Sequence, residues 1–162
     1  MGMDIHMSIV KDGKFIAKDI YDGRNTEWFN NLQDAGWDDE YDNLPIVFGY
    51  SSKAPQEWKD EYKAEDGYFG FYHFLVKYFK EWFEKYRPDI DAGWVSTYDK
   101  WRIENKGYIP DDVPHYLPED ARIEDMHFVE FTNPYDCSAW LYNYLIEHEI
   151  DDNADVIYCF DH

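Results

Sequence analysis

Four aspartates and one histidine lie in the first 25 residues of this chain. Asp4 and His6 lie two residues apart in a segment with strand character, so both project from the same face of that strand. A histidine beside a carboxylate can act as a general acid or base, because a hydrogen bond to one ring nitrogen fixes the tautomer and raises the basicity of the other. The same side chains bind divalent metals. The alternatives are simple ligand binding, or a polar surface with a histidine–aspartate hydrogen bond.

The Asp12-Gly13 pair predicts a β-hairpin between residues 3–10 and 14–21, because a type I′ turn needs positive φ at both central residues. With a two-residue loop, His6 faces Asp19. We therefore take His6, Asp4 and Asp19 as the candidate catalytic residues. Strand alternation predicts one apolar and one polar face. The apolar face contains Ile5, Met7, Ile9, Ile16 and Ile20, and the polar face contains Asp4, His6, Ser8, Asp19 and Tyr21.

A second candidate feature follows the hairpin, where Gly23-Arg24-Asn25 leads into a predicted helix. Glycine permits close approach of the backbone, a helix N-terminus offers free N–H groups, and arginine supplies a fork of donors. These residues predict a site for phosphate or carboxylate. The alternative is that Arg24 neutralises Asp4 or Asp22, while Asn25 only caps the helix.

The last predicted strand ends in Phe160-Asp161-His162. If the first and last strands are neighbours, Asp161 joins the candidate ligand-binding residues Gly23, Arg24 and Asn25. The sequence identifies no cofactor.

The remaining patterns predict alternating strands and helices. A hairpin together with strands separated by helices is typical of an α+β fold with a mainly antiparallel sheet. We expect that sheet to pack against a long aromatic-rich helix and several shorter helices. The expected helices are 26–36, 54–64, 68–87, 96–105 and 134–148; the further strands are 44–50, 126–132 and 155–161, and 107–124 is an irregular loop.

The 162 residues predict a single domain covering 1–162. Aromatic residues make up 20% of the chain, more than one small core readily holds, so some should lie on an interaction surface. The broad aromatic stripe of the expected helix 68–87 permits either a monomer or a homodimer. Two cysteines, Cys137 and Cys159, make no disulfide framework. A reducing, cytoplasmic setting is expected.

The net charge of −20 bears on the partners. Acidic residues dominate segments 31–66, 110–136 and 147–162, whereas the first 30 residues are nearly neutral. So much negative charge opposes direct binding to nucleic acid and favours either good solubility or a basic protein partner. No apolar run approaches the length of a membrane span, and no signal peptide is expected.

Three short motifs resemble a group of uncharacterised phage and bacterial proteins. These begin Met-Gly-(Cys or Thr)-Asp-Ile-His, continue with a Gly-Arg-Asn-Tyr segment that opens a helix, and end in Phe-Asp-Asn. The chain departs from this pattern at Met3, Thr26 and His162. The resemblance covers about a quarter of the length and implies a phage or prophage setting, but no activity. The matching residues are Gly2, Asp4, Ile5, His6, Gly23, Arg24, Asn25, Phe160 and Asp161.

Two functions remain open from the sequence. The first is a polar small-molecule site for an anionic or phosphate-bearing ligand, with metal binding as a variant. The second is an acidic interaction protein, or an inhibitor that imitates nucleic acid, without chemistry of its own.

Overall fold

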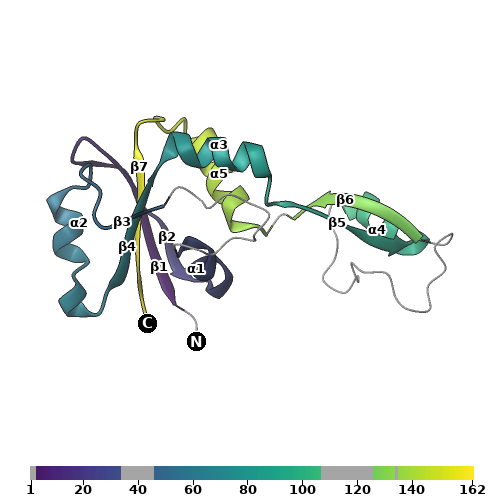
Figure 1. The fold of residues 1–162 in the computed structure, drawn as a ribbon, viewed down its shortest axis with the longest axis horizontal. Helices are drawn as coiled ribbons and strands as arrows, with labels where there is room; N and C mark the ends of the chain where they lie inside the picture. The colour runs from purple at the N-terminus through teal and green to yellow at the C-terminus, as the bar shows by residue number, and fades with distance from the viewer. Residues whose placement is uncertain (1–2, 34–45, 107–125, 134) are drawn as a thin grey trace. The chain divides into compact units, whose positions relative to one another are not determined.

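The structure, a computed structural model, describes residues 3–33, 46–106, 126–133 and 135–162. The chain divides into two compact units (Figure 1): residues 1–86 with 142–162, and residues 87–141. The first unit contains β1 (Asp4–Lys11), β2 (Lys14–Arg24), α1 (Thr26–Leu32), β3 (Val47–Phe48), α2 (Gln56–Glu61), a 3₁₀ turn (Ala64–Asp66), β4 (Phe69–Leu75), α3 (Val76–Tyr86) and β7 (Asp155–Asp161). The second contains β5 (Ile90–Ser96), α4 (Thr97–Lys106) and β6 (Met126–Thr132), and α5 (Cys137–Glu147) runs from the second unit into the first.

The first unit is built on a five-stranded sheet in the order β2-β1-β7-β4-β3, with antiparallel neighbours throughout. The predicted α+β class, the antiparallel sheet and the N-terminal hairpin are therefore confirmed. Asp12 and Gly13 both have positive φ, at 54° and 73°, as the hairpin turn requires. The first and last strands are neighbours, so Asp4 lies opposite Asp161.

Two register shifts in the hairpin change the predicted pairing. Val10 faces Phe15 as expected, but Ile9 faces Ala17 and Met7 faces Tyr21. Extra residues on β2 produce these bulges, and each one moves later side chains to different partners. Tyr21 therefore lies on the apolar face, where it meets Trp28 edge-to-face at 4.9 Å. Ile16, predicted for the core, is exposed.

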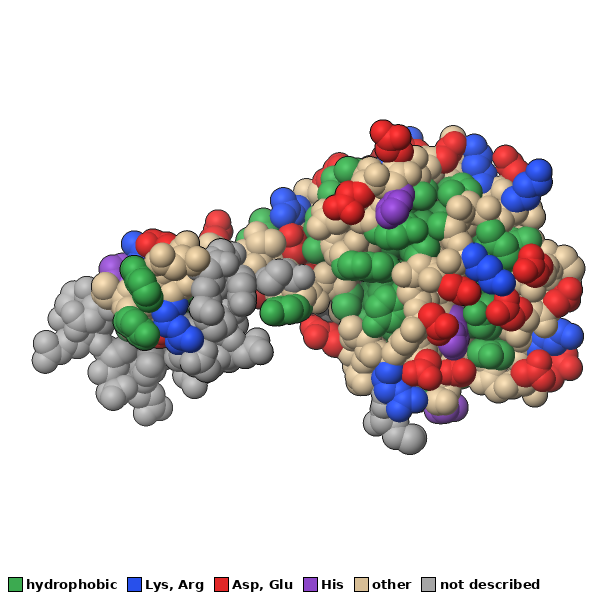
Figure 2. Space-filling model, turned by 180° about the vertical axis from the view of Figure 1, so that it is seen from behind, with side chains coloured by type: hydrophobic (Ala, Val, Ile, Leu, Met, Phe, Trp, Pro, Cys, Tyr) green, Lys and Arg blue, Asp and Glu red, His purple; other side chains and the backbone are tan. Residues whose placement is uncertain are grey.

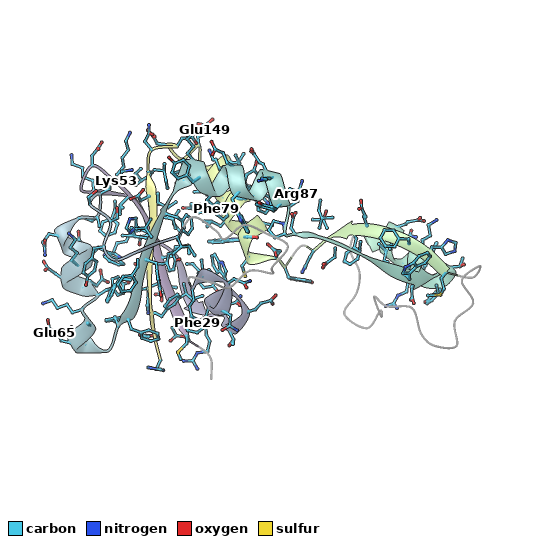
Figure 3. All side chains as sticks on the ribbon, in the orientation of Figure 1. Phe29, Lys53, Glu65, Phe79, Arg87 and Glu149 are labelled. Atoms are coloured by element: carbon cyan, nitrogen blue, oxygen red, sulfur yellow. The ribbon has the colours of Figure 1, made fainter. Side chains whose placement is uncertain are left out.

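Both faces of the sheet are covered in the first unit. Phe29 of α1 packs on Phe160 at 4.7 Å, and Phe79 of α3 stacks on Phe74. Trp58 of α2 covers the opposite face. Figure 3 shows Phe29 and Phe79 on one side of the sheet and Glu65 on the side of α2.

The predicted helix 68–87 is wrong in its first half, because residues 69–75 form the strand β4 and only Val76–Tyr86 is helical. β4 lies between β7 and β3 with side chains packed on both faces, so apolar residues occupy consecutive positions. A run of that kind has no period that separates a buried strand from a buried helix. Gly70 has a φ of +65°, which no helix contains.

The second unit is small. β5 and β6 pair as a two-stranded antiparallel ribbon, and α4 packs on one face of it around Val95, Ile103 and Phe131. The predicted strand 126–132 is confirmed, whereas β5 was not predicted. Ser96 caps α4, at the start of the predicted helix 96–105, since its Oγ accepts from the Asp99 N–H at 3.1 Å. The predicted loop 107–124 lies outside the described residues.

None of the described helices is long and apolar enough to cross a membrane.

Candidate functional site

His6 lies in the strand β1, on the face that α2 covers, between two carboxylates from different strands. Its Nδ1 is 2.8 Å from Oδ1 of Asp22 on β2. Its Nε2 is 3.4 Å from Oδ2 of Asp161 on β7. The His6 side chain is 12% exposed, against 29% for Asp161 and 60% for Asp22. The three side chains therefore form a cluster that is closed at the imidazole and open at Asp22.

The predicted pairing of His6 with Asp19 is wrong, because the bulges of the hairpin place Asp22 opposite His6 instead. Asp19 itself occupies the irregular stretch. It adopts a φ of +52°, and its backbone N–H donates to Ser8 Oγ at 2.9 Å. Its carboxylate accepts a 3.3 Å hydrogen bond from the Tyr62 hydroxyl. Asp19 thus reaches the cluster only through Tyr62.

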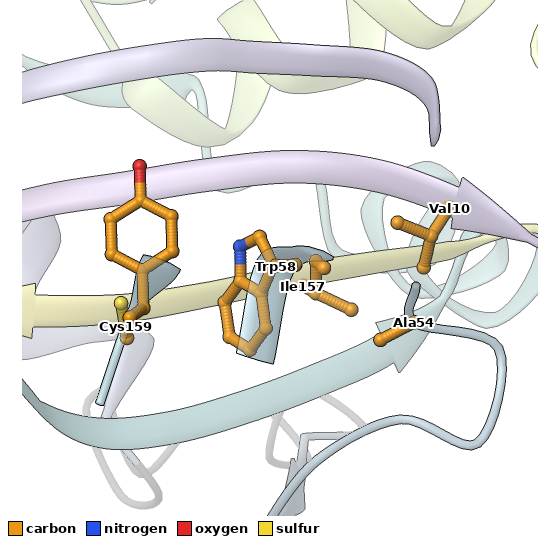
Figure 4. Packing of buried hydrophobic residues seen from close by; sticks show 6 residues of the cluster. Val10, Ala54, Trp58, Ile157 and Cys159 are labelled. Carbon is orange, nitrogen blue, oxygen red and sulfur yellow. The ribbon is translucent and has the colours of Figure 1, made fainter. Parts of the chain in front are cut away.

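Aromatic rings form the wall of the cluster. Tyr62 lies 5.2 Å from the His6 ring, centroid to centroid, and Tyr68 meets that ring edge-on at 5.6 Å. Trp58 lies 5.5 Å from Tyr62, centroid to centroid, and belongs to a buried cluster with Val10, Ile157 and Cys159 of the sheet (Figure 4). The rings exclude water from the imidazole, which strengthens its electrostatic interactions with the carboxylates.

Several polar atoms of the cluster are buried without a hydrogen bond. Both ring nitrogens of His6 and Oδ1 of Asp161 have no hydrogen-bond partner among the described residues. The short Nδ1–Asp22 approach is thus an electrostatic contact, because its direction does not align with the ring N–H. Leaving a buried polar atom unpaired costs about 1–3 kcal/mol.

The structure gives the residues of the predicted anion site other partners. Arg24 ends β2, opposite Asp4, and its Nε is 3.0 Å from the Asp4 carboxylate. Asn25 caps α1, since its side-chain oxygen accepts from the Trp28 N–H at 2.9 Å. Gly23 pairs with Ile5 in the hairpin. The ligand-binding role predicted for Gly23, Arg24 and Asn25 stays a prediction.

The groups around His6 resist gaining further negative charge. Burial raises the pKa of the Tyr62 phenol, and the Asp19 carboxylate raises it further. Burial also raises the pKa of the Cys159 thiol, with a further contribution from Asp161. The pKa of Tyr68 rises for the same two reasons, burial and Asp161. Because the thiolate is the reactive form of cysteine, a raised pKa lowers the reactivity of the Cys159 thiol.

No group of three or more histidine, cysteine, aspartate or glutamate side chains within the described ranges could hold a metal ion. Asp4, His6 and Asp161 come together at one end of the sheet, but Asp4 is engaged by Arg24.

Sequence reasoning missed Asp22, Tyr62 and Tyr68. The sequence shows Asp22 near the end of β2, but it contains no clear signal for the bulges that place Asp22 opposite His6. Tyr62 and Tyr68 lie more than 50 residues from His6 and reach it only through the packing of α2 and the start of β4.

No family model, curated protein or solved structure matches this chain.

Proposed function

We propose that this chain binds a small cationic molecule, an amine or a guanidine, at the cluster of His6, Asp22, Asp161, Tyr62 and Tyr68. One observation carries the proposal: Oδ1 of Asp161, an acceptor, is buried without a hydrogen-bond partner among the described residues, in a region rich in carboxylates. An ammonium group offers three donors and a guanidinium five, and neither brings a negative charge.

The negative charge around the site favours a ligand with a positive charge. Asp19, Asp22 and Asp161 surround the aromatic wall, whereas the nearby Arg24 pairs with Asp4. Burial raises the pKa values of Tyr62 and Tyr68, and the carboxylates of Asp19 and Asp161 raise them further. A phosphate would be repelled here, although the sequence favoured an anionic ligand.

The aromatic wall adds a second source of affinity for cations. A cation over the face of a tyrosine gains about 0.5–1 kcal/mol at an exposed site and about 2 kcal/mol when desolvated. Tyr62 and Tyr68 stand at 85° to one another, 5.0 Å apart. Carboxylates supply charge and hydrogen-bond acceptors, and the rings supply an apolar surface for the ligand's carbon atoms.

His6 acts in this proposal as a positioning residue. Its imidazole lies between Asp22 and Asp161 and holds the two carboxylates at the edge of the cluster. Its Nδ1 already faces Asp22 and its Nε2 already faces Asp161, so neither nitrogen faces a substrate. For that reason we propose binding, and the acid–base roles of His6, Asp4 and Asp19 stay predictions.

A thermal-shift titration tests the proposal. Spermidine, agmatine and tetramethylammonium should raise the Tm, whereas inorganic phosphate and AMP should not. A ligand at 100 times its Kd stabilises a protein by about 2.7 kcal/mol, which is several degrees for a chain of this size. Asp161→Asn and Asp22→Asn should each weaken the shift, because each removes a carboxylate from the site.

Asp12→Asn is the matched control, since it removes one acid from the opposite end of the same hairpin and should leave the shift unchanged. A shift with phosphate or AMP alone would refute the cationic ligand and support the anionic one. A shift with Zn²⁺ or Mn²⁺ alone, lost in Asp161→Asn, would make the site a metal site. If Asp12→Asn and Asp161→Asn lost the spermidine shift equally, the Tm shift would depend on the total negative charge of the protein and not on this site.

A second candidate function is an acidic protein that binds a basic partner or imitates nucleic acid. The net charge of −20 favours it. Two of the most acidic stretches, 36–42 and 111–125, lie outside the described residues. The phage or prophage origin and the cytoplasmic location are further proposals, which rest on the sequence motifs and on the two cysteines.

A further inference from the structure

Among the residues that the structure describes in the second unit, one face of the β5–β6 ribbon is uncovered, and we call it the open face. On its other face lies α4 (Figure 1), whose Ile103 packs with Val95 and Phe131 of the ribbon. The strand register assigns every second residue to the open side. The open face is made of Ile90, Ala92, Trp94, Ser96, Met126, Phe128, Glu130 and Thr132.

Two large rings stand together at the centre of this open face. Trp94 and Phe128 are direct partners across the ribbon, with ring centroids 5.6 Å apart. Trp94 is 38% exposed and Phe128 is 58% exposed. A two-stranded ribbon needs a packed face for stability, and here α4 supplies that on the other side. A paired tryptophan and phenylalanine left in solvent are typical of a binding surface.

Charge distinguishes the open face from the outer surface of α4. On α4, the exposed Tyr98 and Trp101 stack on one another, and the Arg102 guanidinium lies 5.8 Å from the Tyr98 ring. The open face of the ribbon contains no Lys or Arg among its described positions, and it carries Glu130. Its rings therefore have no cation of their own on that face, and its only formal charge is negative.

We propose that the open face of the β5–β6 ribbon binds a basic polypeptide segment, with Lys or Arg side chains lying on Trp94 and Phe128 and pairing with Glu130. Cations gain energy from the faces of both rings, and the ring pair provides an apolar platform for the long stems of Lys and Arg. A second copy of this chain is a poor occupant, because two molecules of charge −20 repel each other. Figure 2 shows how strongly acidic side chains outnumber basic ones on the surface in view.

Fluorescence anisotropy with a labelled arginine-rich peptide tests this surface. Trp94→Thr combined with Phe128→Thr should weaken peptide binding roughly 5- to 30-fold, the sum of two exposed cation–π contacts. The matched control is Phe48→Thr, which removes a 77% exposed phenylalanine from β3 of the first unit and should leave the affinity unchanged. Far-ultraviolet circular dichroism checks that each variant is folded.

Two single charge substitutions test the same surface if the double variant unfolds. Glu130→Gln should weaken binding, whereas Asp91→Asn, which makes the same charge change on the α4 side of the ribbon, should not. Equal effects of these two variants would overturn the proposal, because binding would then follow total charge. A dimer in sedimentation that Trp94→Thr and Phe128→Thr dissociate would also overturn it, in favour of self-association. Both assays are independent of spermidine binding at the His6 cluster.

Discussion

Tyr62 links the two irregular features of the candidate site. Its ring lies against His6, and its hydroxyl donates to Asp19, which the bulge holds at a positive φ. Positive φ is costly for a residue other than glycine, and the Tyr62 bond is one interaction that stabilises it. One neutral phenol therefore supports both the bulge that brings Asp22 to His6 and the wall of the cluster.

The stability of the protein should fall as pH rises above about 10, in part because of Tyr62. Its pKa is raised in the folded state from the ordinary value of 10.0, so the unfolded chain loses this proton first. The contribution is fully present below that pH and is lost as pH rises toward the folded pKa. Urea unfolding over a pH series should show a shallower decline in Tyr62→Phe than in the wild type.

Tyr78→Phe, at an exposed phenol of α3, should keep the wild-type decline. Identical alkaline slopes in Tyr62→Phe and the wild type would contradict the assignment.

At the scale of elements, β4 joins the short edge strand β3 to the rest of the sheet. It lies between β7 and the short β3, and its pairing with β7 shifts register between Phe69 and Tyr72. Gly70 sits in that irregularity with φ +65°. A Cβ at this position would lie 2.5 Å from the Phe160 ring, so only glycine fits. The close approach lets the ring of Phe160 pack under the strand.

Gly70→Ala should therefore lower the free energy of unfolding by about 1–3 kcal/mol, through the ring clash and the strained backbone. Gly23→Ala is the comparison in β2, where the nearest atom to a new Cβ is 3.9 Å away and φ is not positive. That change should stay within about 0.5 kcal/mol. Urea titrations of both variants measure the difference, and equal costs would show that the Phe160 contact is unimportant.

At the scale of the whole molecule, residues 87–141 form a unit inserted between α3 and the second half of α5. The chain leaves and returns at one place, because Ile90 pairs with Thr132 and the Asn133 N–H donates to the Asp89 carbonyl at 2.7 Å. The buried residues of the five-stranded sheet, such as Ile5 and Met7, all belong to the other unit.

Replacing residues 91–131 by an Asn-Gly turn should leave the five-stranded unit folded, because the two ends to be joined are already neighbours. The shortened protein should keep a single cooperative urea transition and, if the proposed function holds, the spermidine shift. An unfolded product would instead support the single domain predicted from the length. The arginine-rich peptide should no longer bind, since Trp94 and Phe128 are gone.

The sequence by itself determined the features that depend on neighbouring residues. Asp12-Gly13 specifies the hairpin turn, Asn25 caps α1, and Ser96 with Asp99 caps α4. Each is a contact within a few residues, so the local sequence contains its whole cause. The α+β class followed from the order of such segments.

Only the tertiary structure decided the partners of His6. The bulges in β2 replaced Asp19 by Asp22, and the packing of α2 brought in Tyr62. Likewise β4 is a strand because β7 and β3 pair with it, although its aromatic run also suits a helix. These outcomes depend on register and on burial against distant segments, which local propensity does not encode. The first 25 residues supply the imidazole and Asp22, and the rest of the fold supplies Asp161 and the two tyrosines around them.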